Sequence, residues 1–196
     1  MPKFIVFCRF QYHSSVGVEW TKWFPCNVAD MTEAEAIARY RSRNYPKPAL
    51  TADIVVLSCS KTEKRVLLIR RKGHPFLGRL ALPGGFANEN EPVEATAARE
   101  LEEETGVAGL PMKLIGIFSQ PGRDPRGWVV SAAFLATVNP GKVLIQAGDD
   151  ASEAAWYRIE EKEGALMLFH ENEAIRAEFL VFDHAEILKK ALTISV

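Results

Sequence analysis

Gly85-Phe-Ala-Asn-Glu-Asn-Glu91, followed after seven residues by Arg99-Glu-Leu-Glu-Glu-Glu-Thr-Gly-Val107, is the stretch that decides the fold. A Pro-Gly-Gly turn at residues 83–85 leads into it. Pro92 suits the first position of a helix, and Gly106 suits the left-handed position just after its end. The stretch therefore predicts a helix between these two residues. The apolar residues that recur every four positions, and so predict its buried side, are Val93, Ala97 and Leu101.

The end of this helix concentrates negative charge. At 100° per residue, Glu100, Glu103 and Glu104 lie within about 100° of one another around the helix axis. Like charges this close repel, so we expect a cation to offset them. Hard divalent metals with oxygen ligands are the natural candidates, Mg²⁺ first. Glu102 projects away from this side and is expected to be solvated, whereas Arg99 lies beside it and can hold a glutamate through a bidentate contact.

The stretch resembles the Nudix box: Gly, five residues, Glu, seven residues, Arg-Glu, an aliphatic, any residue, Glu-Glu, any residue, Gly, an aliphatic. Every fixed position is filled, from Gly85 to Val107. The resemblance to the Nudix fold covers residues 50–192 and implies hydrolysis of a nucleoside diphosphate linked to another group. Strands interleaved with two helices independently favour a layered helix–sheet–helix domain. We therefore expect an α+β chain, an α/β/α sandwich around a mixed sheet.

The resemblance also implies roles for individual residues. Glu100, Glu103 and Glu104 are the implied ligands of Mg²⁺, with Mn²⁺ as an alternative. The carbonyl of Gly84 or Gly85 adds another ligand, and Gly85 is our first choice. Metals would neutralise the pyrophosphate, lower the pKa of a bound water and stabilise the leaving phosphate. Arg99 and Glu91 are the implied supports of the box.

A general base outside the box is often used in this family, at varying positions. The acidic turn at residues 148–153 precedes Trp156-Tyr157, where other Nudix chains place a loop carboxylate. We take Asp150 as the first candidate and Glu153 as the second. The alternative is an ordinary surface turn whose aspartate caps the next element.

The substrate class depends on residues outside the box. The segment Ser119–Trp128 resembles the corresponding segment of ADP-ribose pyrophosphatases, in which a proline about fifteen residues beyond the box is typical. Pro121 lies fourteen residues beyond Val107. The same segment also occurs in the related Nudix-type transcription regulators of NAD metabolism.

Several residues are candidates for substrate contact. The proline-restricted loop carries Arg123 and Arg126, which can bind phosphate or ribose oxygens unless one of them pairs with Asp124. Arg70 heads a basic run, residues 70–72, at a strand end, where the alternative is simple solvation. Phe86 can stack on adenine or form part of the rim. The histidines, His74 and His184 included, are expected to be structural.

Three functions remain open. The first is a Mg²⁺-dependent ADP-ribose pyrophosphatase that yields AMP and ribose 5-phosphate. The second is a Nudix hydrolase of another nucleotide, such as NADH or an oxidised nucleoside triphosphate. The third is a regulator that senses ADP-ribose without hydrolysis, a class that carries a winged-helix domain after the Nudix domain. Only about a dozen residues follow Asp183-His184, and the box is complete, so we expect catalysis.

Length and composition bound the remaining properties. The 196 residues suit an N-terminal extension, residues 1–48, and a Nudix domain, residues 49–196. A net charge of −1 argues against a general nucleic-acid partner. Three scattered cysteines indicate neither a zinc site nor disulfides, so we expect a cytoplasmic protein. No apolar run approaches the ~20 residues of a membrane helix. The sequence leaves open whether the chain forms a homodimer.

The remaining elements are predicted from local pattern. The extension reads as a β-hairpin, with strands at 3–12 and 17–24, followed by a helix at 30–41 that Asp30 or Thr32 caps. Its role is either a dimer contact, a pocket wall or an addition to the core. The main domain is expected to contain strands at 52–59, 65–70, 113–118, 128–137 and 156–159 and a helix at 172–194.

Overall fold

The computed structural model describes residues 7–8, 12–14, 17–19, 24–25, 32–60, 62–139, 141, 143–146 and 151–194. The chain divides into two compact units, Met1–Pro46 and Lys47–Val196. The assignment of residues 1–48 to an N-terminal extension and of residues 49–196 to a Nudix domain remains a prediction.

Among its described residues, the first unit contains short strands and one helix. The strands β2 (Tyr12–Ser14) and β3 (Gly17–Glu19) form an antiparallel hairpin, and β1 (Phe7–Cys8) pairs with β4 (Phe24–Pro25). Helix α1 (Glu33–Ser42) begins after Thr32, one of the two predicted caps. Thr32 and Glu35 form a reciprocal capping box, which satisfies backbone N–H groups at the helix start. Asp30, the other predicted cap, lies outside the described residues.

The second unit is built on one mixed sheet. Within the described residues its strand order is β13-β12-β11-β6-β5-β10-β9, with β7 beside β6 and β8 beside β5. The pair β5–β10 is parallel and the other pairs are antiparallel. The strands are β5 (Ala49–Cys59), β6 (Lys64–Arg71), β7 (Leu80–Ala81), β8 (Gly84–Phe86), β9 (Lys113–Phe118), β10 (Val129–Val138), β11 (Ala151–Lys162), β12 (Ala165–His170) and β13 (Glu173–Arg176).

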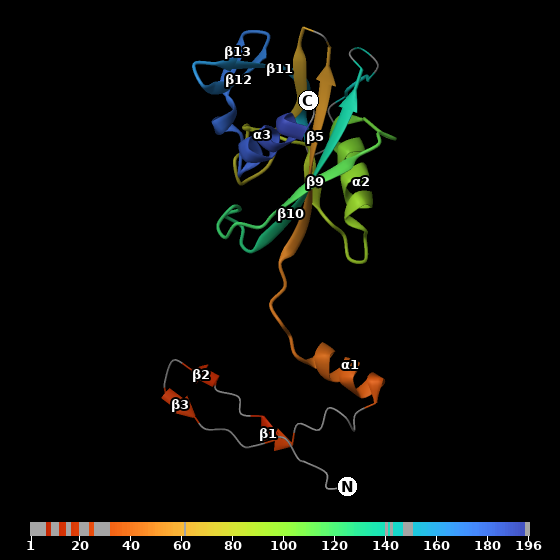
Figure 1. Ribbon diagram of the computed structural model, residues 1–196, viewed down its shortest axis with the longest axis vertical. Helices are drawn as coiled ribbons and strands as arrows, with labels where there is room; N and C mark the ends of the chain where they lie inside the picture. The colour runs from red at the N-terminus through yellow and green to blue at the C-terminus, as the bar shows by residue number, and fades with distance from the viewer. Residues whose placement is uncertain are drawn as a thin grey trace. The chain divides into compact units, whose positions relative to one another are not determined.

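The central strand β5 is covered on both faces. Its side chains alternate between two cores: Ile54 and Val56 pack with Leu101 of helix α2 (Val93–Thr105), and Val55 and Leu57 pack against helix α3 (His184–Ile194). A strand buried on both faces is almost continuously apolar, as this one is. Figure 1 shows α2 and α3 on opposite sides of the sheet. The predicted α+β class, a mixed sheet between helices, is confirmed.

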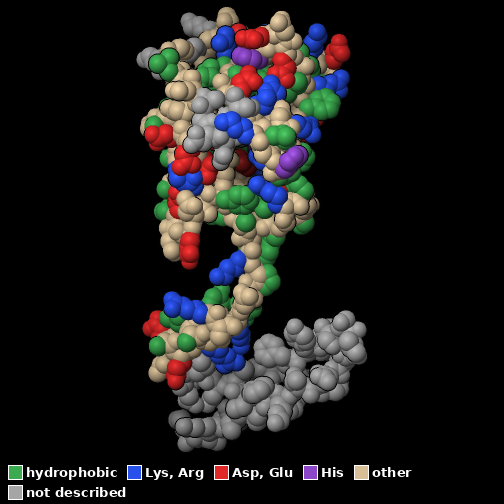
Figure 2. Space-filling view, turned by 180° about the vertical axis from the view of Figure 1, so that it is seen from behind, with side chains coloured by type: hydrophobic (Ala, Val, Ile, Leu, Met, Phe, Trp, Pro, Cys, Tyr) green, Lys and Arg blue, Asp and Glu red, His purple; other side chains and the backbone are tan. Residues whose placement is uncertain are grey.

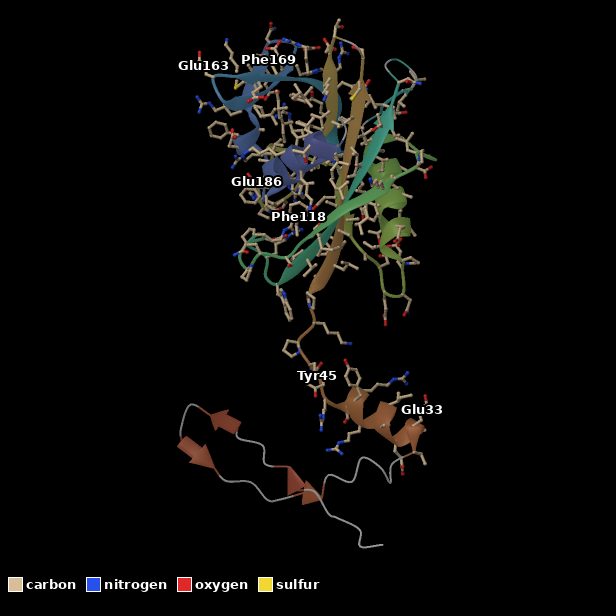
Figure 3. All side chains as sticks on the ribbon, viewed as in Figure 1. Glu33, Tyr45, Phe118, Glu163, Phe169 and Glu186 are labelled. Carbon is tan, nitrogen blue, oxygen red and sulfur yellow. The ribbon has the colours of Figure 1, made fainter. Side chains whose placement is uncertain are left out.

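The surface of the second unit mixes both signs of charge. Figure 2 shows basic and acidic side chains interspersed over its visible face. Figure 3 marks Phe118 at the end of β9, where the Nζ atom of Lys190 lies 5.6 Å from its ring centroid. In the described part of the chain, no helix is long and apolar enough to cross a membrane.

Several bounds differ from the prediction: β11 is longer than the strand predicted at 156–159, α1 begins and ends later than the helix predicted at 30–41, and β12 was not predicted. Two further differences concern the tail and the box helix. The predicted helix at 172–194 is wrong in its first half: β13 and a short 3₁₀ turn, Ala177–Phe179, precede α3, which begins only at His184. The alanines and glutamates there favour a helix locally, but pairing with β12 overrides that preference. The other difference is one residue, since Pro92 is the N-cap of α2 rather than its first helical residue.

Candidate active site

The segment Leu82–Gly85 leads into the box, and hydrogen bonds to the sheet hold its backbone in place. Gly84 begins β8 and pairs with β5. A Cβ built on Gly84 would collide with the carbonyl oxygen of Ala52, so only glycine fits there. The carbonyl oxygen of Pro83 accepts a hydrogen bond of 2.8 Å from the N–H of Ile54. The start of the box therefore lies directly against the central strand.

Arg99 connects the two ends of the box. Its Nε and Nη2 atoms donate to both carboxylate oxygens of Glu91, at 2.8 and 2.9 Å. Its Nη2 also donates to the carbonyl oxygen of Phe86 at 3.0 Å. Its Nη1 contacts Glu100 at 2.6 Å and Glu103 at 3.0 Å. One guanidinium thus ties the loop before α2 to two of the three glutamates.

Glu91 supports the box as an ionised carboxylate. The hydrogen bond from Arg99, with a further one from the backbone N–H of Asn88, lowers the pKa of Glu91 from 4.5 to about 2. The hydroxyl of Thr96 also donates to it, at 2.9 Å. Contacts with Glu91 and then Glu100 raise the pKa of Arg99. Both partners therefore remain charged over the whole physiological pH range.

The three box glutamates differ in their surroundings. Glu104 is buried, and its Oε2 atom accepts a 2.8 Å hydrogen bond from the N–H of Gly84. The Glu100 carboxylate lies so close to Gly85 that a Cβ there would collide with it. The Glu103 side chain is 57% exposed and bonded to Arg99. Among the described residues, no three His, Cys, Asp or Glu side chains are gathered closely enough to hold a metal ion.

A cavity of about 450 Å³ opens beside these residues. Glu100 and Glu104 line one part of it, next to Gly84 and Gly85. The cationic side chains that line it are Arg71, Lys72, Arg99 and Arg126. Carboxylates can bind cations and arginines can bind phosphate oxygens, so the cavity suits a ligand that combines both.

Arg126 is held at the edge of this cavity. Its Nε and Nη2 atoms contact the carboxylate of Asp124 at distances from 2.7 to 3.1 Å. Burial by itself raises the pKa of Asp124, but these bonds more than offset burial and lower it. The guanidinium carbon lies 4.5 Å from the ring centroid of Phe86 and 5.2 Å from that of Phe182. The pairing with Asp124 that the sequence left open is therefore made by Arg126.

Two adjacent arginines at the end of β6 have different surroundings, because successive side chains of a strand point to opposite faces. Arg70 donates to Glu153 at 2.9 Å and to Glu173 at 2.8 Å. Arg71 instead lines the cavity, and its Nε donates to the carbonyl oxygen of Pro75 at 3.0 Å. Arg71 and Lys72, rather than Arg70, are thus the members of the basic run that line the cavity with Glu100 and Glu104.

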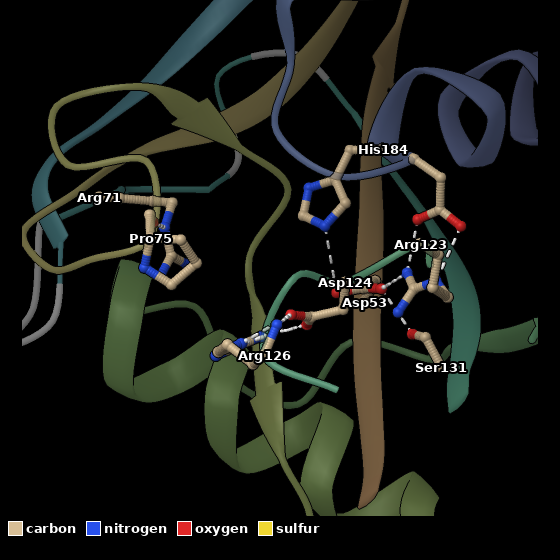
Figure 4. Close-up of polar contacts among 9 residues, drawn as sticks. Asp53, Arg71, Pro75, Arg123, Asp124, Arg126, Ser131 and His184 are labelled. Atoms are coloured by element: carbon tan, nitrogen blue, oxygen red, sulfur yellow. Dashed lines mark hydrogen bonds and ion pairs between the residues drawn. The ribbon is translucent and has the colours of Figure 1, made fainter. Parts of the chain in front are cut away.

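Arg123 belongs to a buried network behind the box (Figure 4). Its Nε and Nη2 atoms donate to Asp183 at 2.8 and 2.5 Å, and Nη2 also contacts Asp53 at 3.3 Å. Ser131 donates to Asp53, and His184 lies 3.5 Å from it. Burial by itself lowers the pKa of Arg123, but the two carboxylates more than offset burial and raise it. The Arg123 side chain is only 4% exposed.

The structure brings most of the predicted site residues to one place. The predicted residues that line the cavity are Gly85, Phe86, Arg99, Glu100, Glu104 and Arg126. Glu103 projects from the same helix toward solvent. Arg70 and Glu153 pair with each other away from the cavity lining, and Arg123 is enclosed. Asp150 lies outside the described residues.

The buried network of Asp53, Arg123, Asp183 and His184 was not predicted from the sequence. Asp53, Ser131 and Asp183 were not singled out, and His184 was expected only to be structural. One signal was available: Asp53 is the only charged residue in the otherwise apolar run of residues 52–57. A carboxylate in a buried strand needs a partner, so its presence predicts a buried cation elsewhere.

Comparisons with known proteins show which family the chain is similar to. Residues 47–180 match the NUDIX domain family. The chain is 37% identical over 172 residues to an ADP-ribose pyrophosphatase of Methanocaldococcus jannaschii, with 86% of this chain and 89% of that protein covered.

Two solved structures are similar as well. The first is a MutT/nudix family protein from Enterococcus faecalis, at 40% identity and a TM-score of 0.72, covering 84% of this chain and 69% of that one. The second is the NUDIX domain of Shewanella oneidensis NrtR complexed with ADP ribose, at 28% identity and a TM-score of 0.67. That match covers 85% of this chain and all of the other (100%).

Fold, box and comparisons together define a hydrolase of nucleoside diphosphate derivatives. The chain belongs to the Nudix family. The predicted family and the predicted pyrophosphohydrolase class are confirmed. Members of this family generally use divalent metal ions.

Proposed function

We propose that this chain hydrolyses ADP-ribose to AMP and ribose 5-phosphate with Mg²⁺, or alternatively Mn²⁺. The observation that carries the proposal is the shared cavity, where two box glutamates face Arg71, Lys72 and Arg126. The similarity to an ADP-ribose pyrophosphatase over 86% of the chain supports the choice of substrate. In the reaction, water adds across one P–O bond of the diphosphate, and each product keeps one phosphate.

The donor set of the cavity fits a hard divalent cation. Glu100 and Glu104 offer carboxylate oxygens beside the backbone of Gly85, and hard cations prefer oxygen ligands. Glu103, which is exposed, would complete the set by rotating away from Arg99. A bound cation would supply charge neutralisation and a more acidic water. Arg99 would then keep its bidentate hold on Glu91 and preserve the loop.

The remaining side chains would orient the substrate. Arg71, Lys72 and Arg126 carry the positive charge that the diphosphate requires. Phe86, 40% exposed next to Arg126, would pack against the base or ribose. Glu153 and Asp150 remain the proposed general bases, and Glu153 would first have to release Arg70. Arg70 and Arg123 would act on the substrate only after leaving their carboxylate partners.

A substrate panel tests the proposal. The purified protein is incubated with Mg²⁺ and ADP-ribose, NADH, a sugar nucleotide or oxidised dGTP, and the phosphate-bearing products are separated and quantified. We expect ADP-ribose to give the highest kcat/KM, with AMP and ribose 5-phosphate in equal amounts. A clear preference for the nucleoside triphosphate would reject ADP-ribose as the substrate and favour the second hypothesis.

A second candidate function is sensing of ADP-ribose without hydrolysis. It is favoured by the similarity to the NrtR domain that was crystallised with ADP ribose. The complete set of box glutamates favours catalysis instead. Calorimetric binding of ADP-ribose that leaves the ligand intact after prolonged incubation with Mg²⁺ would decide for the sensor.

Compartment and assembly remain proposals. We propose a cytoplasmic location from the cysteine pattern and a homodimer as the assembly to test. Light scattering coupled to size-exclusion chromatography measures the mass in solution, and a mass close to one 21.8 kDa chain would reject the dimer.

A further inference from the structure

We propose that His184 is a positioning residue that sets the divalent-metal affinity of the box through the backbone of Leu82–Gly85. It touches neither the substrate nor the metal in this proposal. The inference rests on the metal site proposed above and adds a residue from the opposite side of the sheet, at the start of α3.

The contact that carries the inference is buried. The N–H of Leu82 donates a hydrogen bond of 2.9 Å to Nδ1 of His184, although the two residues lie 102 positions apart in the sequence. Because Nδ1 accepts, the neutral ring carries its proton on Nε2, which faces Oδ1 of Asp53 at 3.5 Å (Figure 4). Burial lowers the pKa of His184 and keeps the ring neutral, against the opposing effect of nearby Asp53 and Asp183.

The backbone between this contact and the box glutamates is short and held at every residue. Leu82 bonds to His184, the carbonyl of Pro83 bonds to Ile54, and the N–H of Gly84 bonds to Glu104. Gly85 follows directly and lies against the Glu100 carboxylate. A displacement of Leu82 would therefore move the backbone groups that contact two of the proposed metal ligands.

His184 is itself held rigidly. Asp53, which faces Nε2, pairs with Gly84 across the sheet and accepts hydrogen bonds from Ser131 and Arg123. Arg123 is fixed in turn by Asp183, the residue before His184. Groups behind a metal site that orient its ligands commonly change metal affinity when they are altered. The network of His184, Asp53, Arg123 and Asp183 lies behind Gly84 and Gly85 in the same way.

Two substitutions separate the two contacts of the ring. His184→Asn places an amide oxygen near the position of Nδ1, so the bond from Leu82 can be kept while the contact with Asp53 is lost. His184→Gln places its amide near the position of Nε2, so the contact with Asp53 can be kept while the bond from Leu82 is lost. His170→Gln is the matched control for metal affinity, because His170 contacts the carbonyl of Trp156 and lies 3.8 Å from Glu153, neither of which is a proposed metal ligand.

The affinity for Mn²⁺ is measured without substrate, by titrating each protein with Mn²⁺ and quantifying the free ion by electron paramagnetic resonance. The melting temperature of each variant is measured as well, to show that it is folded. We expect His184→Gln to weaken Mn²⁺ binding about 10-fold. We expect His184→Asn and His170→Gln to keep the wild-type affinity. At saturating metal, KM for ADP-ribose should be nearly the same in all four proteins.

The outcomes distinguish this inference from the proposed function. Equal Mn²⁺ affinity in wild-type and folded His184→Gln protein would overturn the positioning role alone. Equal weakening by Asn and Gln would also overturn it, because the bond from Leu82 would then not be what matters. A wild-type protein that binds no Mn²⁺ would overturn the proposed metal site and the positioning role together.

Discussion

Two arginine–carboxylate clusters lie near the same turn and differ mainly in burial. In the Arg99 cluster, formed with Glu91, Glu100 and Glu103, the arginine side chain is 26% exposed. In the Arg123 cluster, formed with Asp53 and Asp183, it is 4% exposed. Exposed ion pairs exchange partners at little cost, whereas a buried charge that loses its partner is strongly destabilising. The first cluster is therefore suited to rearrange around ligands and the second to hold the turn in place.

The largest effect is expected from breaking the buried cluster. Arg123→Met leaves Asp53 and Asp183 without their shared cation, and we expect the free energy of unfolding to fall by about 3–5 kcal/mol. Urea denaturation monitored by circular dichroism measures it. Arg65→Met, which removes an exposed arginine, is the control and should change stability little. A loss in Arg123→Met no larger than in the control would show that burial does not separate the two clusters.

A smaller effect, on catalysis rather than stability, is expected in the exposed cluster. Glu103→Gln removes a proposed metal ligand, and we expect kcat for ADP-ribose to fall at least ~100-fold, as loss of a main transition-state charge stabiliser does. Because Glu103 is exposed, the melting temperature should stay near that of the wild type. Glu102→Gln, a neighbouring exposed glutamate on the same helix, serves as the control and should keep full activity. Unchanged kcat in Glu103→Gln would remove Glu103 from the proposed ligand set.

The smallest effect concerns the pH dependence of stability. Folding lowers the pKa of Glu91 from 4.5 to about 2, so the folded protein binds this proton less readily than the unfolded chain. The contribution of Glu91 to stability is complete above about pH 4.5 and is lost as the pH falls toward 2. We expect Glu91→Gln to flatten the decline of unfolding free energy across this window, as measured by urea titrations at successive pH values. Arg99→Gln, which removes the main cause of the pKa shift, should flatten this decline too. If unfolding free energy declined with pH as steeply in both variants as in the wild type, the lowered pKa of Glu91 in the folded protein would be contradicted.

The sequence predicted the parts of the fold that depend on local pattern. The box helix, its left-handed end at Gly106 and its buried positions Ala97 and Leu101 all appear as expected. The tail was mispredicted, because Glu173–Arg176 forms an edge strand only when β12 lies beside it. The choice between Arg70 and Arg71 likewise depends on which strand face meets the cavity, and a run of basic residues does not contain that information.

The spacing of glycine, arginine and glutamates along one chain was enough to identify the family, because a helix places residues three and four apart on the same side. The tertiary structure decided which charges are enclosed. His184 reaches Leu82, and Arg123 reaches Asp53, across separations of 102 and 70 residues. Contacts at such distances arise from packing two helices on opposite faces of one sheet, and no local rule of spacing encodes them.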